Sequence, residues 1–373
     1  TFLKAEFRYA DFEGTTFAAD ATFAEATFDS DAEFIDVAFG GAADFRGAEF
    51  RGGDNVLSDD ADFERSTFAE RATFAAARFA FADFHEVAFQ GEATFADAAF
   101  DGDADFRGVE AREGVDFGEA RFTGDADFSS VVLAGDVDFT GAEFHGGDNA
   151  ADEDLSFRDA VLRGPVAFRM ARFRFATFEG ARFEATADFA HAAFDREGVF
   201  SGAVFVGSAT FDEGRFDDDA DFSEAAFRGD ASFRGVEFHG GDNVDDDDLS
   251  LADAVFEGEA DFRRGEFGET TAGRAAFGDR LVLAGATFER AAAFDEAVFS
   301  GPVEASGVAF SGGNTVDDAV SFADATFEDR VDFHRAWVAT ATFANAAFEG
   351  VVAFREAWFD DTTTFEGAAF RDR

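Results

Sequence analysis

The amino-acid sequence predicts an all-β solenoid in which the chain winds as a four-sided coil. Three observations support this prediction. Phe accounts for 58 of the 373 residues, against one Tyr and two Trp, so a repeated unit must hold one fixed aromatic position. The Phe residues recur at alternating steps of five and six residues. Longer interruptions follow multiples of four steps, which places all of them on one edge of a coil with four steps per turn.

The spacing within one step predicts which side chains point inward. The first regular steps join Phe23, Phe28, Phe34, Phe39, Phe45 and Phe50. Two residues before each of them stands Ala or Val, and most residues in between are polar or small. Because alternate residues of a strand point the same way, the small residue and the Phe both face the core. Steps of five and six do not match the helical period of 3.6, so we expect strands, in about 16 coils of about 22 residues.

This pattern resembles the motif of the pentapeptide-repeat family, in which a small residue, any residue, Phe or Leu and two polar residues follow one another. Ala-Thr-Phe-Ala-Glu at 21–25 and Ala-Asp-Phe-Arg-Gly at 43–47 fit the motif directly. The resemblance covers essentially all of residues 1–373. It implies a right-handed quadrilateral β-helix, although the six-residue steps depart from the commonest pattern of the family.

We expect residues 1–373 to form a single continuous solenoid with loop insertions at 51–60, 145–154, 239–248 and 311–319. Phe2 and Phe370 already occupy core positions, and neither end of the sequence shows a polar cap. An uncovered terminal coil exposes apolar side chains and unpaired backbone groups. We therefore expect the natural protein to extend further, or neighbouring copies to cover the ends.

The insertions contain the strongest candidates for cation binding. Three of them begin with Gly-Gly-Asp-Asn and continue with further Asp, and carboxylate and amide oxygens suit calcium or magnesium. The alternative is a solvated acidic loop in which Gly and Asn serve the turn. No other cofactor is expected. The candidate ligands are Asp54, Asn55, Asp59, Asp60, Asp148, Asn149, Asp152, Asp154, Asp242, Asn243, Asp245 and Asp247.

Two further groups of residues are informative. Trp337 and Trp358 stand four steps apart, so we expect them on one face of adjacent coils, either as a contact patch or as a shield for the last coils. The five His are dispersed, and His145 and His239 lie on coils too distant to share a metal. No nucleophile and base can be paired, so the sequence predicts a protein that is not an enzyme.

The charge narrows the choice of partners. The formal net charge is −50, and Lys4 is the only lysine. An acidic surface almost without lysine is typical of a protein that works in multimolar salt, where ions screen its self-repulsion. Direct nucleic-acid binding is excluded because it requires a basic face. No apolar run is long enough to span a membrane. The location stays open between the cytoplasm and the surface of a cell in a high-salt environment.

These features favour a non-catalytic structural or protein-interaction rod, as a segment of a larger protein or assembly from a halophile. We expect a protein partner or self-association, and no small-molecule substrate. The first alternative is a DNA mimic that binds a DNA-handling enzyme such as gyrase, which the family resemblance implies for some members. The predicted rod would carry one net charge per ~1.5 Å, close to the ~1.7 Å of duplex DNA. The second alternative is a regulatory module attached to a membrane domain.

Overall fold

The computed structural model describes residues 1–52, 61–147, 154–240, 248–312 and 319–371. Its regular elements are the strands β1 to β63, each two residues long, and the described residues contain no helix. The chain divides into two compact units, Thr1–Ala185 and Thr186–Arg373.

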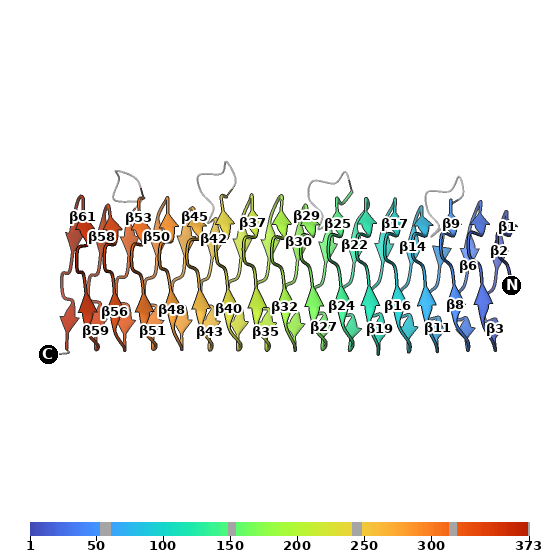
Figure 1. Cartoon of the computed structure of the whole chain (residues 1–373), viewed down its shortest axis with the longest axis horizontal. Coiled ribbons are helices and arrows are strands. Elements are labelled where there is room, and N and C mark those ends of the chain that lie inside the picture. Colours follow the sequence, from blue (N-terminus) through green and yellow to red (C-terminus); the bar gives the residue numbers. More distant parts are fainter. Residues whose placement is uncertain (53–60, 148–153, 241–247, 313–318, 372–373) are drawn as a thin grey trace. The chain divides into compact units, whose positions relative to one another are not determined.

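The first unit winds through four strands per coil. Its first coil consists of β1 (Glu6–Phe7), β2 (Ala10–Asp11), β3 (Thr16–Phe17) and β4 (Ala21–Thr22). Each strand pairs in parallel with the strand four places further along the chain, so that one coil stacks on the next (Figure 1). Four parallel sheets result, which we call A, B, C and D after β1, β2, β3 and β4.

The second unit repeats this arrangement. It begins with β32 (Ala187–Asp188) in sheet D, and then β33 (Ala193–Phe194), β34 (Gly198–Val199) and β35 (Val204–Phe205) start its sheets A, B and C. The predicted four-sided coil of about 22 residues is therefore confirmed in each unit. A single continuous solenoid over residues 1–373 stays a prediction.

Stacked phenylalanines fill the centre of the coils, as the spacing predicted. The rings of Phe23 and Phe45, one coil apart, lie 4.8 Å apart at their centroids and 3° from parallel. Phe23 also meets Phe34, which follows β6 (Ala32–Glu33) on the opposite side of the coil, edge to face at 5.3 Å and 89°. Both geometries are favourable for aromatic pairs. Phe23 and Phe45 are fully buried, and the small residues Ala21 and Ala43 point inward beside them.

Tight turns explain why polar residues or Gly follow many of the core positions. The backbone N–H of Ala26 donates to the carbonyl of Phe23 at 2.9 Å, which closes a four-residue turn. Glu25, the third residue of that turn, has a φ of 53°, and Gly47 takes the equivalent position with a φ of 61°. Such a turn requires a left-handed residue at its third position. The step of the solenoid is thus set locally by the backbone.

Candidate functional site

The outward positions of the strands determine what a partner would meet. In sheet B of the first unit, successive coils place an acidic side chain at the same outward position, in register from strand to strand. Neighbouring strands lie about 4.8 Å apart, so the carboxylates form a closely spaced line. We call this line the acidic row; it consists of Asp11, Glu33, Asp62, Asp83, Asp105 and Asp127.

Many carboxylates of the acidic row also stabilise the turns that follow the strands. Asp83 accepts a hydrogen bond from the backbone N–H of His85 at 2.7 Å, and Asp105 accepts one from Arg107 at 2.8 Å. Asp side chains commonly bond to the backbone two residues later in this way. Local turn chemistry therefore accounts for Asp at this position, and stacking of the coils aligns the charges.

Sheet C of the first unit presents a contrasting outward surface. The corresponding positions of its first four strands are uncharged: Thr16, Ala38, Thr67 and Ala88. At this outward position, the first four strands of sheet C therefore differ from the acidic row of sheet B.

Asp261 in the second unit is a buried carboxylate held between two arginines. It follows Ala260 in β44 (Ala260–Asp261), and its side chain is 3% exposed. Arg234 Nε donates to Oδ2 at 2.6 Å, and Arg263 Nε donates to Oδ1 at 2.8 Å. Burial by itself raises the pKa of this carboxyl group, but the hydrogen bonds from Arg263 and Arg234 outweigh burial and lower the pKa below its usual value.

Replacement of Asp261 by Asn should lower the free energy of unfolding by about 1–3 kcal/mol at neutral pH, because hydrogen bonds to charged groups are lost. A carboxyl group whose pKa falls on folding stabilises the folded state above its unfolded pKa, about 3.9 for Asp. That contribution is lost as the pH falls through the lowered pKa of the folded state. Urea unfolding should be measured at neutral pH and below about pH 4. The difference in the free energy of unfolding between the wild type and the Asp261→Asn variant should become smaller at the lower pH.

Asp253→Asn is a matched control for this measurement. Asp253 accepts a hydrogen bond from Arg274 Nε at 2.7 Å, but both side chains are largely exposed. An exposed ion pair contributes at most about 1 kcal/mol. If the Asp253 and Asp261 variants lost equal amounts of unfolding free energy, the burial of Asp261 would have no energetic consequence.

Of the predicted cation ligands, Asp154 alone falls within the described residues, and the other eleven lie outside them. Asp154 is buried, with its Oδ1 3.6 Å from Arg174 Nη1. Arg174 also donates to the carbonyl of Gly147 at 2.8 Å. The structure thus places a guanidinium beside this carboxylate, where the chain enters the next strand. Cation binding by the insertions stays a prediction.

The second unit has an equivalent carboxylate, which was not among the predicted ligands. Asp248 is 1% exposed, and its Oδ2 accepts a hydrogen bond from the backbone N–H of Glu269 at 2.5 Å. Arg290 Nη1 donates to its Oδ1 at 3.2 Å. A buried Asp paired with an Arg thus precedes the strand that follows each of the insertions at 145–154 and 239–248.

The two tryptophans lie side by side, as the spacing predicted. Trp337 begins β57 (Trp337–Val338), Trp358 begins β61 (Trp358–Phe359), and the two residues are register partners in sheet A. They are 36% and 64% exposed, and Trp358 Nε1 donates to Asp360 Oδ1 at 3.3 Å. Ala309 is the register partner of Trp337 on its other side. We call Ala309, Trp337 and Trp358 the tryptophan patch.

The histidines show a feature that sequence spacing alone did not reveal. His145 Nε2 lies 3.2 Å from Glu143 Oε2, and His239 Nε2 lies 3.3 Å from Glu237 Oε2. Each imidazole therefore contacts the carboxylate two residues before it. In the second unit, Glu266 of the next coil joins this pair. The four-step spacing of Glu237 and Glu266 was the available signal.

A shallow hollow lies on the outer side of sheet D in each unit. The hollow of the first unit has a volume of about 500 Å³ and is lined mainly by Asp20, Asp44, Arg46, Arg71 and Thr73. That of the second unit has a volume of about 600 Å³ and includes Glu304, Arg330, Asp332, His334 and Arg355. Both hollows are open and include charged side chains in their lining. Within the described residues, no helix has the length and apolar character needed to cross a membrane.

Comparison with known proteins identifies the family. The family model described as pentapeptide repeats (9 copies) matches residues 2–49, 84–132, 112–149, 152–193 and 200–246, together more than half of the chain. The chain is a pentapeptide-repeat protein. This assignment agrees with the stacked Phe core and the four-stranded coils, and it confirms the resemblance seen in the sequence.

Two solved structures are among those similar to this chain. HetL, a pentapeptide-repeat protein involved in heterocyst differentiation regulation from the cyanobacterium Nostoc sp. strain PCC 7120, is 12% identical, with 84% of this chain and 90% of HetL covered and a TM-score of 0.24. QnrB1, a plasmid-mediated fluoroquinolone resistance protein, is 14% identical, with 70% and 91% covered and a TM-score of 0.27. At these values the similarities carry no argument about function. No curated protein matches the chain.

Proposed function

We propose that this pentapeptide-repeat protein is a non-catalytic interaction protein whose second unit contacts a protein partner through the tryptophan patch. The supporting observation is that both Trp residues of the chain lie in register on one sheet and are exposed. Trp is strongly enriched among the residues that contribute most to protein binding, because its large ring loses little entropy when it is covered.

The charge of the chain specifies the chemistry of that partner. Asp360 accepts a hydrogen bond beside Trp358, and the chain as a whole carries a formal charge of −50. Like charges placed across an interface disfavour association, whereas complementary charges accelerate it. The partner should therefore offer an apolar pocket for the indole rings, bordered by basic side chains.

Capture from an extract of the source organism, followed by measurement with the purified partner, tests this proposal. The variant Trp337→Ala/Trp358→Ala should weaken binding at least tenfold, which corresponds to the loss of a hot-spot residue. Val351→Ala is the control, because Val351 is 60% exposed and lies outside the tryptophan patch. Circular dichroism should show that both variants are folded.

Indole fluorescence provides an independent measurement on the unmodified chain. Since Trp337 and Trp358 are the only Trp residues, their emission reports on the tryptophan patch alone. Binding of a Trp-free partner domain should shift this emission to shorter wavelength by removing water from the rings. The patch would be excluded as the contact surface if binding left the emission unchanged and the double variant bound the partner as tightly as the wild type.

The acidic row supports a second candidate function, mimicry of DNA towards a DNA-handling enzyme such as gyrase. Such mimicry calls for two tracks of carboxylates at phosphate-like spacing, and the acidic row is one line of in-register carboxylates that supports it. The experiment is inhibition of gyrase supercoiling by the purified chain. The charge-neutralised variant Asp83→Asn/Asp105→Asn should inhibit less than the wild type, and no inhibition at equimolar concentration would remove this candidate.

A further inference from the structure

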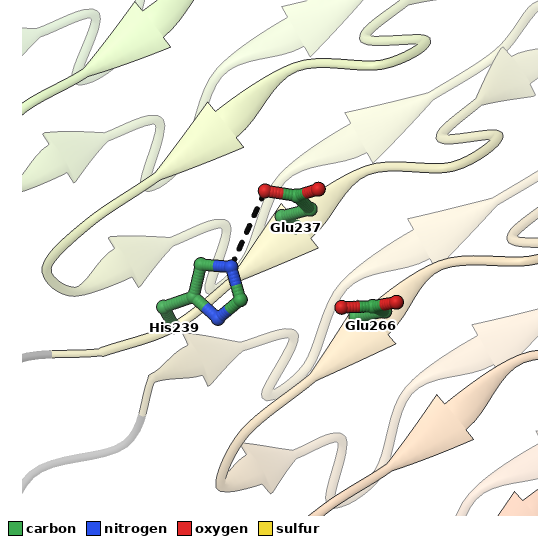
Figure 2. Close-up of side chains that lie close together, drawn as sticks. All are labelled: Glu237, His239 and Glu266. Carbon is green, nitrogen blue, oxygen red and sulfur yellow. Dashed lines mark hydrogen bonds and ion pairs between the residues drawn. The ribbon is translucent and has the colours of Figure 1, made fainter.

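We infer that Glu237, His239 and Glu266 form a surface site for a zinc-like divalent ion in the second unit. One ligand atom from each residue lies within 4.8 Å of the others. Figure 2 shows the three side chains converging on one side of sheet A, with Glu237 and His239 from one coil and Glu266 from the next. This site is separate from the insertions that the sequence suggested for calcium or magnesium.

Strand geometry explains why the three side chains meet. Glu237 begins β41 (Glu237–Phe238), and Phe238 points into the core, so Glu237 and His239 both point outward. Glu266 begins β45 (Glu266–Phe267) and is the register partner of Glu237. Backbone hydrogen bonds from Glu266 N to Val236 O at 2.8 Å and from Gly268 N to Phe238 O at 3.0 Å hold the two strands together. The donor atoms therefore project from paired strands, which limits their movement.

Electrostatics indicate that a cation belongs between the two carboxylates. Glu237 and Glu266 lie directly opposite each other on neighbouring strands, an arrangement that is destabilising for like charges. Arg215, the register partner of Glu237 on its other side, forms an ion pair with Asp217 instead. Among the described residues, no Arg or Lys forms an ion pair with either glutamate, and His239, paired with Glu237, is the one basic side chain that does.

The first unit contains the same Glu-x-His sequence with its charge already balanced. Glu143 has Arg121 and Arg172 as register partners, and Arg121 Nη2 lies 2.6 Å from Glu143 Oε2. His145 lies 3.2 Å from the same carboxylate. Arg172 of the first unit stands at the position that Glu266 has in the second unit. Arginine there cannot serve as a ligand, and its positive charge removes the need for a bound cation. The two sites thus differ in the residue that decides metal binding.

The types of donor indicate the class of metal. One imidazole nitrogen and two carboxylate oxygens suit Zn²⁺ and other late first-row divalent ions better than Ca²⁺ or Mg²⁺, which prefer oxygen ligands alone. With bonds of about 2.0–2.2 Å, two ligands of one Zn²⁺ are at most about 4.4 Å apart. Small side-chain rotations bring the three donors within that range and leave open positions for water. The group Asp11, Glu13 and Glu33 in the first unit lacks a nitrogen donor and supports no such inference.

Calorimetric titration of the full-length chain with Zn²⁺ tests the inference, in about 1 M potassium nitrate with excess Mg²⁺ to suppress diffuse counterion binding. The wild type should bind one Zn²⁺ at this site. His239→Ala and Glu266→Arg should each weaken that binding at least tenfold, and His145→Ala should leave it unchanged. Co²⁺ in place of Zn²⁺ gives an absorption spectrum whose ligand-field bands should change in His239→Ala and persist in His145→Ala.

Two outcomes would overturn the inference. Equal Zn²⁺ binding by the wild type, His239→Ala and Glu266→Arg would show that the ion is an adventitious counterion of an acidic surface. An equal loss in His145→Ala and His239→Ala would show that any histidine beside a glutamate suffices. Circular dichroism of the metal-free variants should match the wild type, since all three side chains lie on the outer surface.

Discussion

Replacement of Phe128 by Ala should lower the free energy of unfolding by about 3–5 kcal/mol, which is the cost of removing a large aromatic ring from a packed core. The ring is 2% exposed and stacks on Phe106 at 4.6 Å and on Phe157 at 4.9 Å. It also meets Phe117 and Phe139 edge to face. Removal of the ring therefore disturbs contacts to the coils on both sides.

Urea unfolding followed by circular dichroism measures this effect, with Glu113→Ala as the control. Glu113 lies in the same unit with an exposed side chain, and its replacement should change stability by less than about 0.5 kcal/mol. The Phe128 variant should still fold, because Ala111 and Ala272 occupy equivalent core positions and are buried. Comparable losses in both variants would contradict the assignment of inward and outward positions.

The melting temperature of the chain should rise with salt concentration, by on the order of 10 °C between about 0.01 M and about 2 M KCl. With a net charge of −50, repulsion between coils acts over a Debye length of about 30 Å at the lower salt concentration. Salt shortens that range to a few ångströms. Thermal unfolding followed by circular dichroism gives the measurement.

Acidification separates charge repulsion from a general effect of salt on apolar burial. Near pH 4 about half of the ordinary carboxyl groups are protonated, so the repulsion is smaller. The dependence of the melting temperature on salt should shrink accordingly. An unchanged melting temperature across the salt range at neutral pH would contradict adaptation of this chain to a high-salt environment.

The sequence alone was sufficient to predict the coil, its core and the neighbourhood of the two tryptophans. These features depend on the period of two along a strand and on the constant number of steps per coil, and both can be counted in a linear chain. Counting four steps brought Trp337 beside Trp358, and the structure confirms their register. Four steps in either direction from Phe128 lead to Phe106 and Phe157, and the structure stacks its ring on both.

The interactions of outward side chains required the tertiary structure. From the sequence, Asp125 is a residue of a polar turn, but its Oδ1 accepts a hydrogen bond from the backbone N–H of Gly147 at 2.8 Å, one coil later. Asp154 was predicted as a cation ligand, and the structure places it against Arg174. Long polar side chains have several rotamers, and their choice depends on neighbours that stacking of the coils supplies.

The residues of the proposed zinc site illustrate which features the sequence determines and which features only the three-dimensional structure decides. The sequence determines that Glu237, His239 and Glu266 point outward, because Phe238 and Phe267 occupy core positions. The structure decides that Arg215 pairs with Asp217, whereas Arg121 pairs with Glu143. Inward positions follow from burial of apolar surface, which acts on every coil alike. Outward pairings follow from competition between nearby charges of similar energy, and that competition is decided by the three-dimensional arrangement of the side chains.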